Sequence, residues 1–158
     1  MKTLGLWHDA TSRGLFALAG AALCLVVALY AFEVVARYFF DAPTTWSGEA
    51  VQYSLAVLLF CALPDVTRKA AHVAIDIIPE ALSETSRRKL AVANNLLASC
   101  VTALSGWIVA GEALNQLNRG LLTNAAHPIP RWWLTAIIAI GLFSASLHFL
   151  RHGLEQKP

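Results

Sequence analysis

The fold is decided by residues 15–36, LFALAGAALCLVVALYAFEVVA, a stretch that carries no charge until Glu33. At 1.5 Å per residue, a helix of this length crosses the hydrocarbon core of a bilayer, which is roughly 30 Å thick. Small residues recur through the stretch at helical spacing, which places them on one stripe where another helix can approach closely. Those small residues are Gly14, Ala17, Ala21, Cys24, Ala28 and Ala31. The stretch predicts a first transmembrane helix, from Leu15 to Ala36.

The composition of the whole chain is that of a membrane protein. Of its 158 residues, 57% are hydrophobic and only 14% are charged, against roughly 25% charged in an average soluble domain. The mean hydropathy is +0.56. A net charge of +2 is too small for a nucleic-acid-binding surface, and the basic residues lie beside hydrophobic stretches instead of along one stripe. Nucleic acid is therefore excluded as a partner.

Three further apolar runs predict three further spans. Because the first run is about 20 residues long and others follow it, we expect it to remain a membrane helix and not a cleaved signal peptide. No linker or low-complexity tract divides the chain. The sequence therefore predicts an all-α membrane protein with four transmembrane helices, forming a single domain over residues 1–158. The later spans are expected at about Trp46–Thr67, Leu90–Leu114 and Trp132–Leu150.

The second span is the shortest apolar run. Residues Ala50–Leu63 alone would rise only about 21 Å, so a spanning helix must take in polar residues at both ends. Thr44 or Thr45 is expected to cap its start. Pro64 is expected to kink or loosen its far end, which places Asp65 near an interface or against protein.

Polar and aromatic residues suggest how the last two spans pack. The third span carries a small and polar stripe suited to helix association: Asn95, Ser99, Thr102 and Gly106. Asn94 and Asn95 could instead line an ion path, because amide oxygens can coordinate cations. The fourth span opens with Arg131, Trp132 and Trp133, whose indole rings are typical anchors at headgroup depth.

The distribution of basic residues predicts the orientation, because short loops rich in Lys and Arg stay in the cytoplasm. Nine of the basic residues fall in the N-terminal tail, the middle connection and the C-terminal tail: Lys2, Arg13, Arg68, Lys69, Arg87, Arg88, Lys89, Arg151 and Lys157. The opposite side holds Arg37, Arg119 and Arg131. Both termini are therefore expected in the cytoplasm.

The middle connection is expected to lie along the membrane surface. Ile75, Ile78 and Leu82 repeat at helical spacing, while Asp76 and Glu80 face elsewhere. Pro79 breaks the segment or starts a new turn. The pattern predicts two short amphipathic helices that contact membrane lipid.

The sequence offers few residues for chemistry. A membrane haem protein would need histidines deep in facing helices, but only His148 and His152 lie near a helix end. A thiol oxidoreductase would need paired cysteines, and the three here are solitary. A small independent proton-coupled transporter is the stronger alternative, because Glu33 and Glu49 lie on or beside spans. Both lie near predicted helix ends, where water, Arg37 or a helix N-terminus can stabilise a carboxylate. No enzyme activity and no cofactor are expected.

The first connection reads FEVVARYFFDAP over residues 32–43 and TTWSGE over residues 44–49. The pattern has an Arg-Tyr-x-Phe at the end of the first span, a nearby proline, and a Trp-x-x-Glu that opens the second span. A basic pair, Arg68 and Lys69, follows the second span, and His72 and Asp76 come after it at a spacing of four. This order resembles the small membrane subunit, of DctQ type, of the tripartite ATP-independent periplasmic (TRAP) transporters. The resemblance covers residues 30–80 in detail, and Ala62 and Pro64-Asp65 depart from the family's usual glycine and small apolar stretch.

The resemblance implies a subunit of a complex in the bacterial cytoplasmic (inner) membrane. Its partners would be a large permease subunit, which holds the solute and ion sites, and a periplasmic solute-binding protein. Uptake in such systems is driven by an ion gradient, usually sodium. A structural or assembly role in this non-catalytic scaffold subunit is expected for nine residues: Glu33, Arg37, Tyr38, Trp46, Glu49, Arg68, Lys69, His72 and Asp76. Arg37 can pair with Glu33 on the same helix face or with Glu49 across the connection.

Overall fold

A computed structural model describes residues 2–69, 83–125 and 127–155. Within these ranges the secondary structure consists of four helices, and the prediction of an all-α membrane protein is confirmed: each helix is long and apolar enough to cross a membrane. They are α1 (Lys2–Phe40), α2 (Ser47–Arg68), α4 (Glu84–Arg119) and α5 (Arg131–Glu155). The amphipathic helices expected in the middle connection lie outside the described residues.

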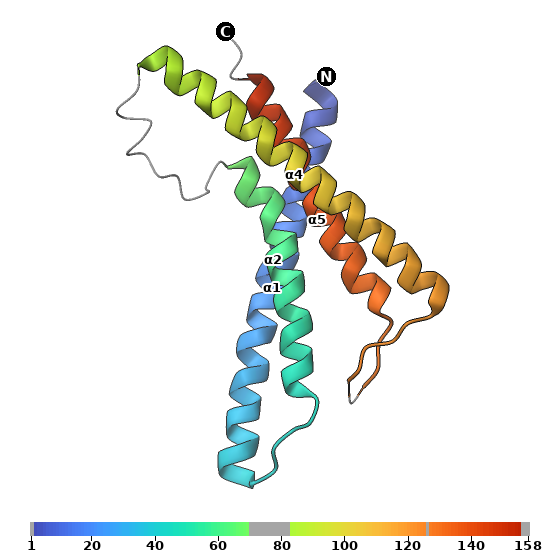
Figure 1. The fold of residues 1–158 in the computed structure, drawn as a ribbon. Helices are drawn as coiled ribbons and strands as arrows, with labels where there is room; N and C mark the ends of the chain where they lie inside the picture. Colours follow the sequence, from blue (N-terminus) through green and yellow to red (C-terminus); the bar gives the residue numbers. More distant parts are fainter. Residues whose placement is uncertain (1, 70–82, 126, 156–158) are drawn as a thin grey trace.

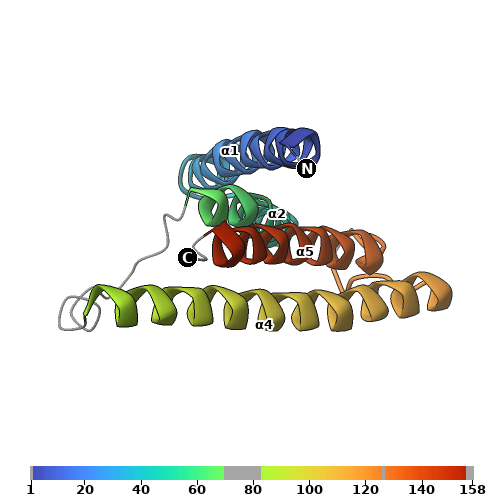
Figure 2. The same cartoon turned by 90° about the horizontal axis from the view of Figure 1, so that it is seen from above.

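The four helices stand in one row and do not close into a bundle. The most extensive contacts are those of α1 with α2, α2 with α5, and α5 with α4, and Figure 2 shows the same order from above. The α1–α2 and α4–α5 hairpins converge near the two termini and diverge towards their loops (Figure 1). Both termini therefore lie at one end of the molecule, and both hairpin loops lie at the other.

Two of the helices are longer than a bilayer is thick. At 1.5 Å per residue, α1 with 39 residues spans about 58 Å and α4 with 36 residues about 54 Å, whereas a bilayer with its headgroups measures roughly 40–45 Å. Both helices must tilt or extend beyond the membrane. Both helices extend past the predicted spans at each end, because the polar residues that flank these spans are also helical.

The face of α1 that is buried against other helices of this chain is not the face that carries the predicted small-residue stripe. Its buried residues include Ser12, Ala19, Ala22 and Val26, and the helix that α1 contacts most extensively is α2. The predicted stripe of Gly14, Ala17, Ala21, Cys24, Ala28 and Ala31 is exposed instead. The stripe leaves a face of α1 open to lipid or to another protein.

The association face predicted for the third span is confirmed between α4 and α5. The Ser99 hydroxyl donates to the Ser146 carbonyl at 3.0 Å, and the Ser146 hydroxyl donates to the Ser99 carbonyl at 2.9 Å. A Cβ atom at Gly106 would lie 3.3 Å from the ring of Phe143, so the absence of a side chain lets the two helices approach. The Asn95 amide donates to Ala91 on its own helix at 3.0 Å.

The crossing of α2 and α5 brings two backbones close together at Gly141 and Phe60. The helix continues through Pro64 to Arg68, but a proline has no N–H, so the Phe60 carbonyl lacks the donor that a helix normally supplies four residues later. A Cβ atom at Gly141 would lie only 2.3 Å from that same carbonyl oxygen. Gly141 therefore presents its Cα–H groups to a carbonyl without its usual partner, a weak but favourable contact where water is scarce.

Backbone geometry ends the helices on the loop side. Asp41 (φ 49°) and Gly120 (φ 60°) adopt left-handed conformations after α1 and α4, as is common at helix C-termini. The expected cap of α2 by Thr44 or Thr45 was wrong. Trp46 occupies the cap position and makes no side-chain hydrogen bond there, because Thr44 binds Glu33 instead.

Candidate functional site

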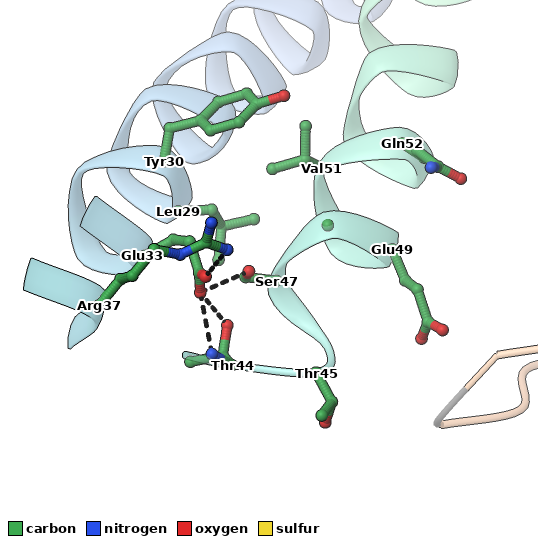
Figure 3. A pocket seen from close by; sticks show the side chains of 11 residues that line it. Leu29, Tyr30, Glu33, Arg37, Thr44, Thr45, Ser47, Glu49, Val51 and Gln52 are labelled. Carbon is green, nitrogen blue, oxygen red and sulfur yellow. Dashed lines mark hydrogen bonds and ion pairs between the residues drawn. The ribbon is translucent and has the colours of Figure 1, made fainter. Parts of the chain in front are cut away.

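Four polar residues of the first hairpin gather around one carboxylate, and we call them the Glu33 cluster: Glu33, Arg37, Thr44 and Ser47. Arg37 donates to Oε1 of Glu33 at 2.7 Å. Oε2 accepts from the Thr44 backbone N–H at 3.2 Å, from the Thr44 hydroxyl, and from the Ser47 hydroxyl at 2.9 Å. Figure 3 shows both oxygens of Glu33 held in this way between α1, the loop and α2.

The sequence builds this cluster from local geometry. Glu33 and Arg37 lie four residues apart, so they occupy one face of α1. The short loop after Asp41 then returns the chain so that Thr44 and Ser47 reach the carboxylate from the side of α2. A charge-assisted hydrogen bond is about twice as strong as one between neutral groups. The Glu33 cluster therefore fixes the first hairpin at its loop end, and it confirms the first of the two pairings expected for Arg37.

The other predicted residues of this hairpin have different surroundings. Trp46 is 38% exposed and lies 6.1 Å from the ring of Phe32. Tyr38 is 79% exposed. The side chain of Glu49 points away from Glu33, towards the loop between α4 and α5 (Figure 3). These three residues surround the Glu33 cluster without joining it.

Two shallow pockets flank α2 near its start. One, of about 340 Å³, lies over the Glu33 cluster and includes Tyr30 and Gln52. The other, also about 340 Å³, lies between α2 and the loop between α4 and α5, and includes Trp46, Tyr53 and His127. Both are at the small end of the range for ligand pockets, and both lie at the loop end of the molecule.

The predicted basic pair Arg68–Lys69 lies at the opposite end, around Asp65. Asp65 is 1% exposed, and Oδ1 accepts from the Arg68 guanidinium at 2.6 and 2.9 Å. The Lys69 ammonium lies 2.7 Å from Oδ2 and 4.8 Å from the ring centre of Phe16 on α1. The expectation that Asp65 lies against protein is confirmed, and the basic pair neutralises it. His72 and Asp76 lie outside the described residues.

A second cluster of polar residues, near the termini, was not predicted from the sequence. We call it the histidine cluster: His8, Ser12, Ser144 and His148. Nε2 of His8 lies 3.0 Å from the Ser144 hydroxyl, and Nε2 of His148 lies 2.8 Å from the Ser12 hydroxyl. The two imidazole rings stack with their centres 4.1 Å apart. The group joins α1 to α5, and His148 is 1% exposed.

His8, Asp9 and His148 place three potential metal-ligand atoms within 4.8 Å of one another. The stacked rings are inclined by only 26°, so their in-plane lone pairs run side by side and do not converge on one ion. Asp9 is also paired with Arg151 at 3.2 Å. The geometry fits a polar contact between helices better than a metal centre.

Seven of the nine predicted residues lie in the described part of the chain, and the structure divides these seven between two ends of the molecule. It brings Glu33 and Arg37 together, and Arg68 with Lys69. Thr44, Ser47 and the histidine cluster were not predicted. The histidine cluster did leave a signal in the sequence, because His8 and Ser12 on one helix, and Ser144 and His148 on another, are each four residues apart.

Comparison with known proteins identifies the family of the chain. A search of the curated proteins finds no significant match. The family model described as "Tripartite ATP-independent periplasmic transporters, DctQ component" matches residues 26–156, which include both the Glu33 cluster and the crossing of α2 and α5. This family is a component of transporters and not a family of enzymes. The chain belongs to the DctQ family of small membrane subunits of TRAP transporters.

Proposed function

We propose that the chain is a non-catalytic scaffold subunit of an ion-gradient-driven solute uptake transporter. It would work beside a large permease subunit, which receives solute from a periplasmic solute-binding protein, in the bacterial cytoplasmic membrane. The family supports this proposal because its description names a tripartite system. Sodium is the coupling ion that we propose, on the basis of the resemblance described above.

The observation that carries the proposal is the open row of helices. On α4, four large apolar side chains form one stripe and are each more than half exposed: Leu97, Val101, Leu104 and Ile108. The small-residue stripe of α1 is exposed on the other edge of the row. A row with two such edges offers more apolar surface than a closed bundle of four helices, which supports a membrane partner along at least one edge.

The carboxylates favour a scaffold over independent proton-coupled transport. Both oxygens of Glu33 are bound by donors, and Asp65 is held by two cations. A coupling carboxylate must release and bind a proton or ion in each cycle, which would break these contacts. Transporters also build their sites from discontinuous helices near the midplane, whereas the four described helices are continuous.

For the orientation, we expect the loop after α1 to face the periplasm and the start of α4 to face the cytoplasm. Single cysteines placed near Asp41 and near Glu84 test this in intact cells. A membrane-impermeant maleimide should label the site near Asp41 and spare the site near Glu84 until the cells are opened. Labelling from outside near Glu84 but not Asp41 would reverse the topology.

Reconstitution tests the function itself. The purified chain in vesicles, under a sodium or proton gradient, should accumulate no solute, and uptake should appear only when the large subunit and the binding protein are added. Vesicles with all three proteins but no gradient are the matched control. Gradient-driven uptake by the chain alone would refute the scaffold proposal and favour Glu33 or Glu49 as a coupling group.

A further inference from the structure

Two of the contacts that join the helical hairpins differ in chemistry. One is the apolar crossing of α2 and α5 at Phe60 and Gly141. The other is the histidine cluster, where side chains of α1 and α5 meet although α2 stands between these helices along the row (Figure 2). Attachments at separate places are needed to set the angle between the hairpins. The Asp9–Arg151 ion pair and the contact of His152 Nε2 with the Thr67 carbonyl at 3.1 Å lie on the same side as the histidine cluster.

We propose that the histidine cluster is a pH-sensitive clasp, in which His8 and His148 are positioning residues that set this angle. This inference draws its importance from the proposed scaffold role, but its test measures only the geometry of this chain. The clasp closes when both imidazoles are neutral and opens when protons bind.

The hydrogen bonds define the closed form. The Ser12 hydroxyl donates to the His8 carbonyl at 3.0 Å, so its oxygen accepts the proton of His148 Nε2 at 2.8 Å. His8 makes the corresponding contact with Ser144 at 3.0 Å. Each ring is therefore fixed at Nε2 by a hydroxyl of the other helix, and the rings stack between these bonds. Two neutral rings can stack in this way without repulsion.

The charges around the rings oppose protonation of the closed form. A proton on one ring would face the other imidazole 4.1 Å away, with Arg151 and His152 of α5 nearby. Asp9 of α1 is the carboxylate facing the rings among the described residues, and it is already paired with Arg151. On α2, Asp65 is neutralised by Arg68 and Lys69. Two protonated rings would be a stacked pair of cations with too little negative charge to balance them.

The position of the clasp gives protons access to it. Along α1, His8 and Arg37 are 29 residues apart, which corresponds to a rise of about 44 Å. This is about the full thickness of a bilayer with its headgroups. An upright α1 would therefore place the Glu33 cluster and the histidine cluster at opposite membrane surfaces, with the clasp on the side of the termini.

The sign of the pH dependence follows from linkage. The closed form binds fewer protons than the open form, so its stability is present at high pH and is lost as the pH falls. An ordinary histidine titrates near pH 6.5. We expect opening with a midpoint at or below about pH 6.5.

Distances between spin labels on the two loops test the clasp. The full chain, with Cys24, Cys61 and Cys100 replaced by alanine, carries labels at Ala42→Cys and Asn124→Cys and is placed in nanodiscs. At pH 8 we expect one narrow distance distribution, and at pH 5 a second population that reverses when the pH is restored. A second pair within one hairpin, Leu90→Cys with Asn124→Cys, should not change with pH.

The matched variant combines His8→Gln with His148→Gln, because glutamine can donate to the serines from an equivalent position but does not titrate. It should keep the pH 8 distribution at pH 5, whereas Ser12→Ala should broaden the distribution even at pH 8. If the wild-type distance distribution did not change between pH 8 and pH 5, the proposal would be wrong. It would also be wrong if the double variant responded to pH as strongly as the wild type.

Discussion

Replacing Gly141 by alanine should destabilise the fold, although alanine is the better helix former by about 1 kcal/mol. The new Cβ atom would lie 2.3 Å from the Phe60 oxygen, and this oxygen belongs to a backbone that cannot rotate away. Either α5 must withdraw along the whole crossing or α2 must distort. Overpacking of this kind typically costs about 1–3 kcal/mol. Unfolding of the purified chain in mixed micelles, at rising fractions of a denaturing detergent, measures the loss.

Gly111 on α4 provides the control for this substitution. A Cβ atom there would meet nothing within 4 Å, so Gly111→Ala should leave stability unchanged or raise it slightly through helix propensity. If Gly141→Ala and Gly111→Ala behaved alike, the close approach of α2 and α5 would not be a determinant of the fold.

At the crossing of α2 and α5, the sequence predicted the limits of one helix but not its contact with the other. The limits predicted for the second span, Trp46–Thr67, lie within one residue of α2, because polar residues had to be taken in to reach a spanning length. Pro64 was expected to weaken that end. The helix instead continues, and the missing N–H of Pro64 leaves the carbonyl of Phe60, four residues earlier, without its usual donor. Gly141 of α5 packs against that carbonyl. Such a contact between helices leaves no local pattern in the sequence.

The arrangement of the helices was not predictable for a similar reason. Periodicity identifies a face of a helix but not its neighbour, since a small-residue stripe suits any close helix. On α4 the stripe around Ser99 and Gly106 packs against α5. On α1 the corresponding stripe, including Ala21 and Ala28, is exposed, and a different face meets α2. A small-residue stripe therefore packs against another helix of the chain on α4, whereas on α1 such a stripe is exposed.

The candidate sites follow the same division between local and long-range contacts. The pairing of Arg37 with Glu33 was predicted because residues four apart share a helix face. Thr44 and Ser47 were not predicted as partners of Glu33, since their positions depend on how the loop returns. The histidine cluster depends on where α1 meets α5, 136 residues apart along the chain.

The Glu33 cluster should matter most for assembly. Glu33→Ala removes the acceptor for Arg37, Thr44 and Ser47 together, so the first hairpin loses its tie at the loop end. We expect a several-fold fall in the amount of complex recovered with the large subunit, the scale that a modest loss of stability produces. Glu33→Gln, which keeps an oxygen for the hydroxyls but loses the charge that binds Arg37, should be intermediate. Co-purification through a tag on the large subunit measures the yield.

Three further substitutions and one control separate assembly from transport. Arg37→Ala, Trp46→Ala and Glu49→Ala should also lower the yield, because these residues lie at a helix boundary. Glu112→Ala removes an exposed carboxylate that accepts from Asn115 and Gln116 of its own helix, so the yield should stay normal. The complex that does assemble should keep its solute preference, measured by competition among organic anions, because we place the solute site in the large subunit. A variant with normal yield and a changed solute preference would place part of that site in the first hairpin.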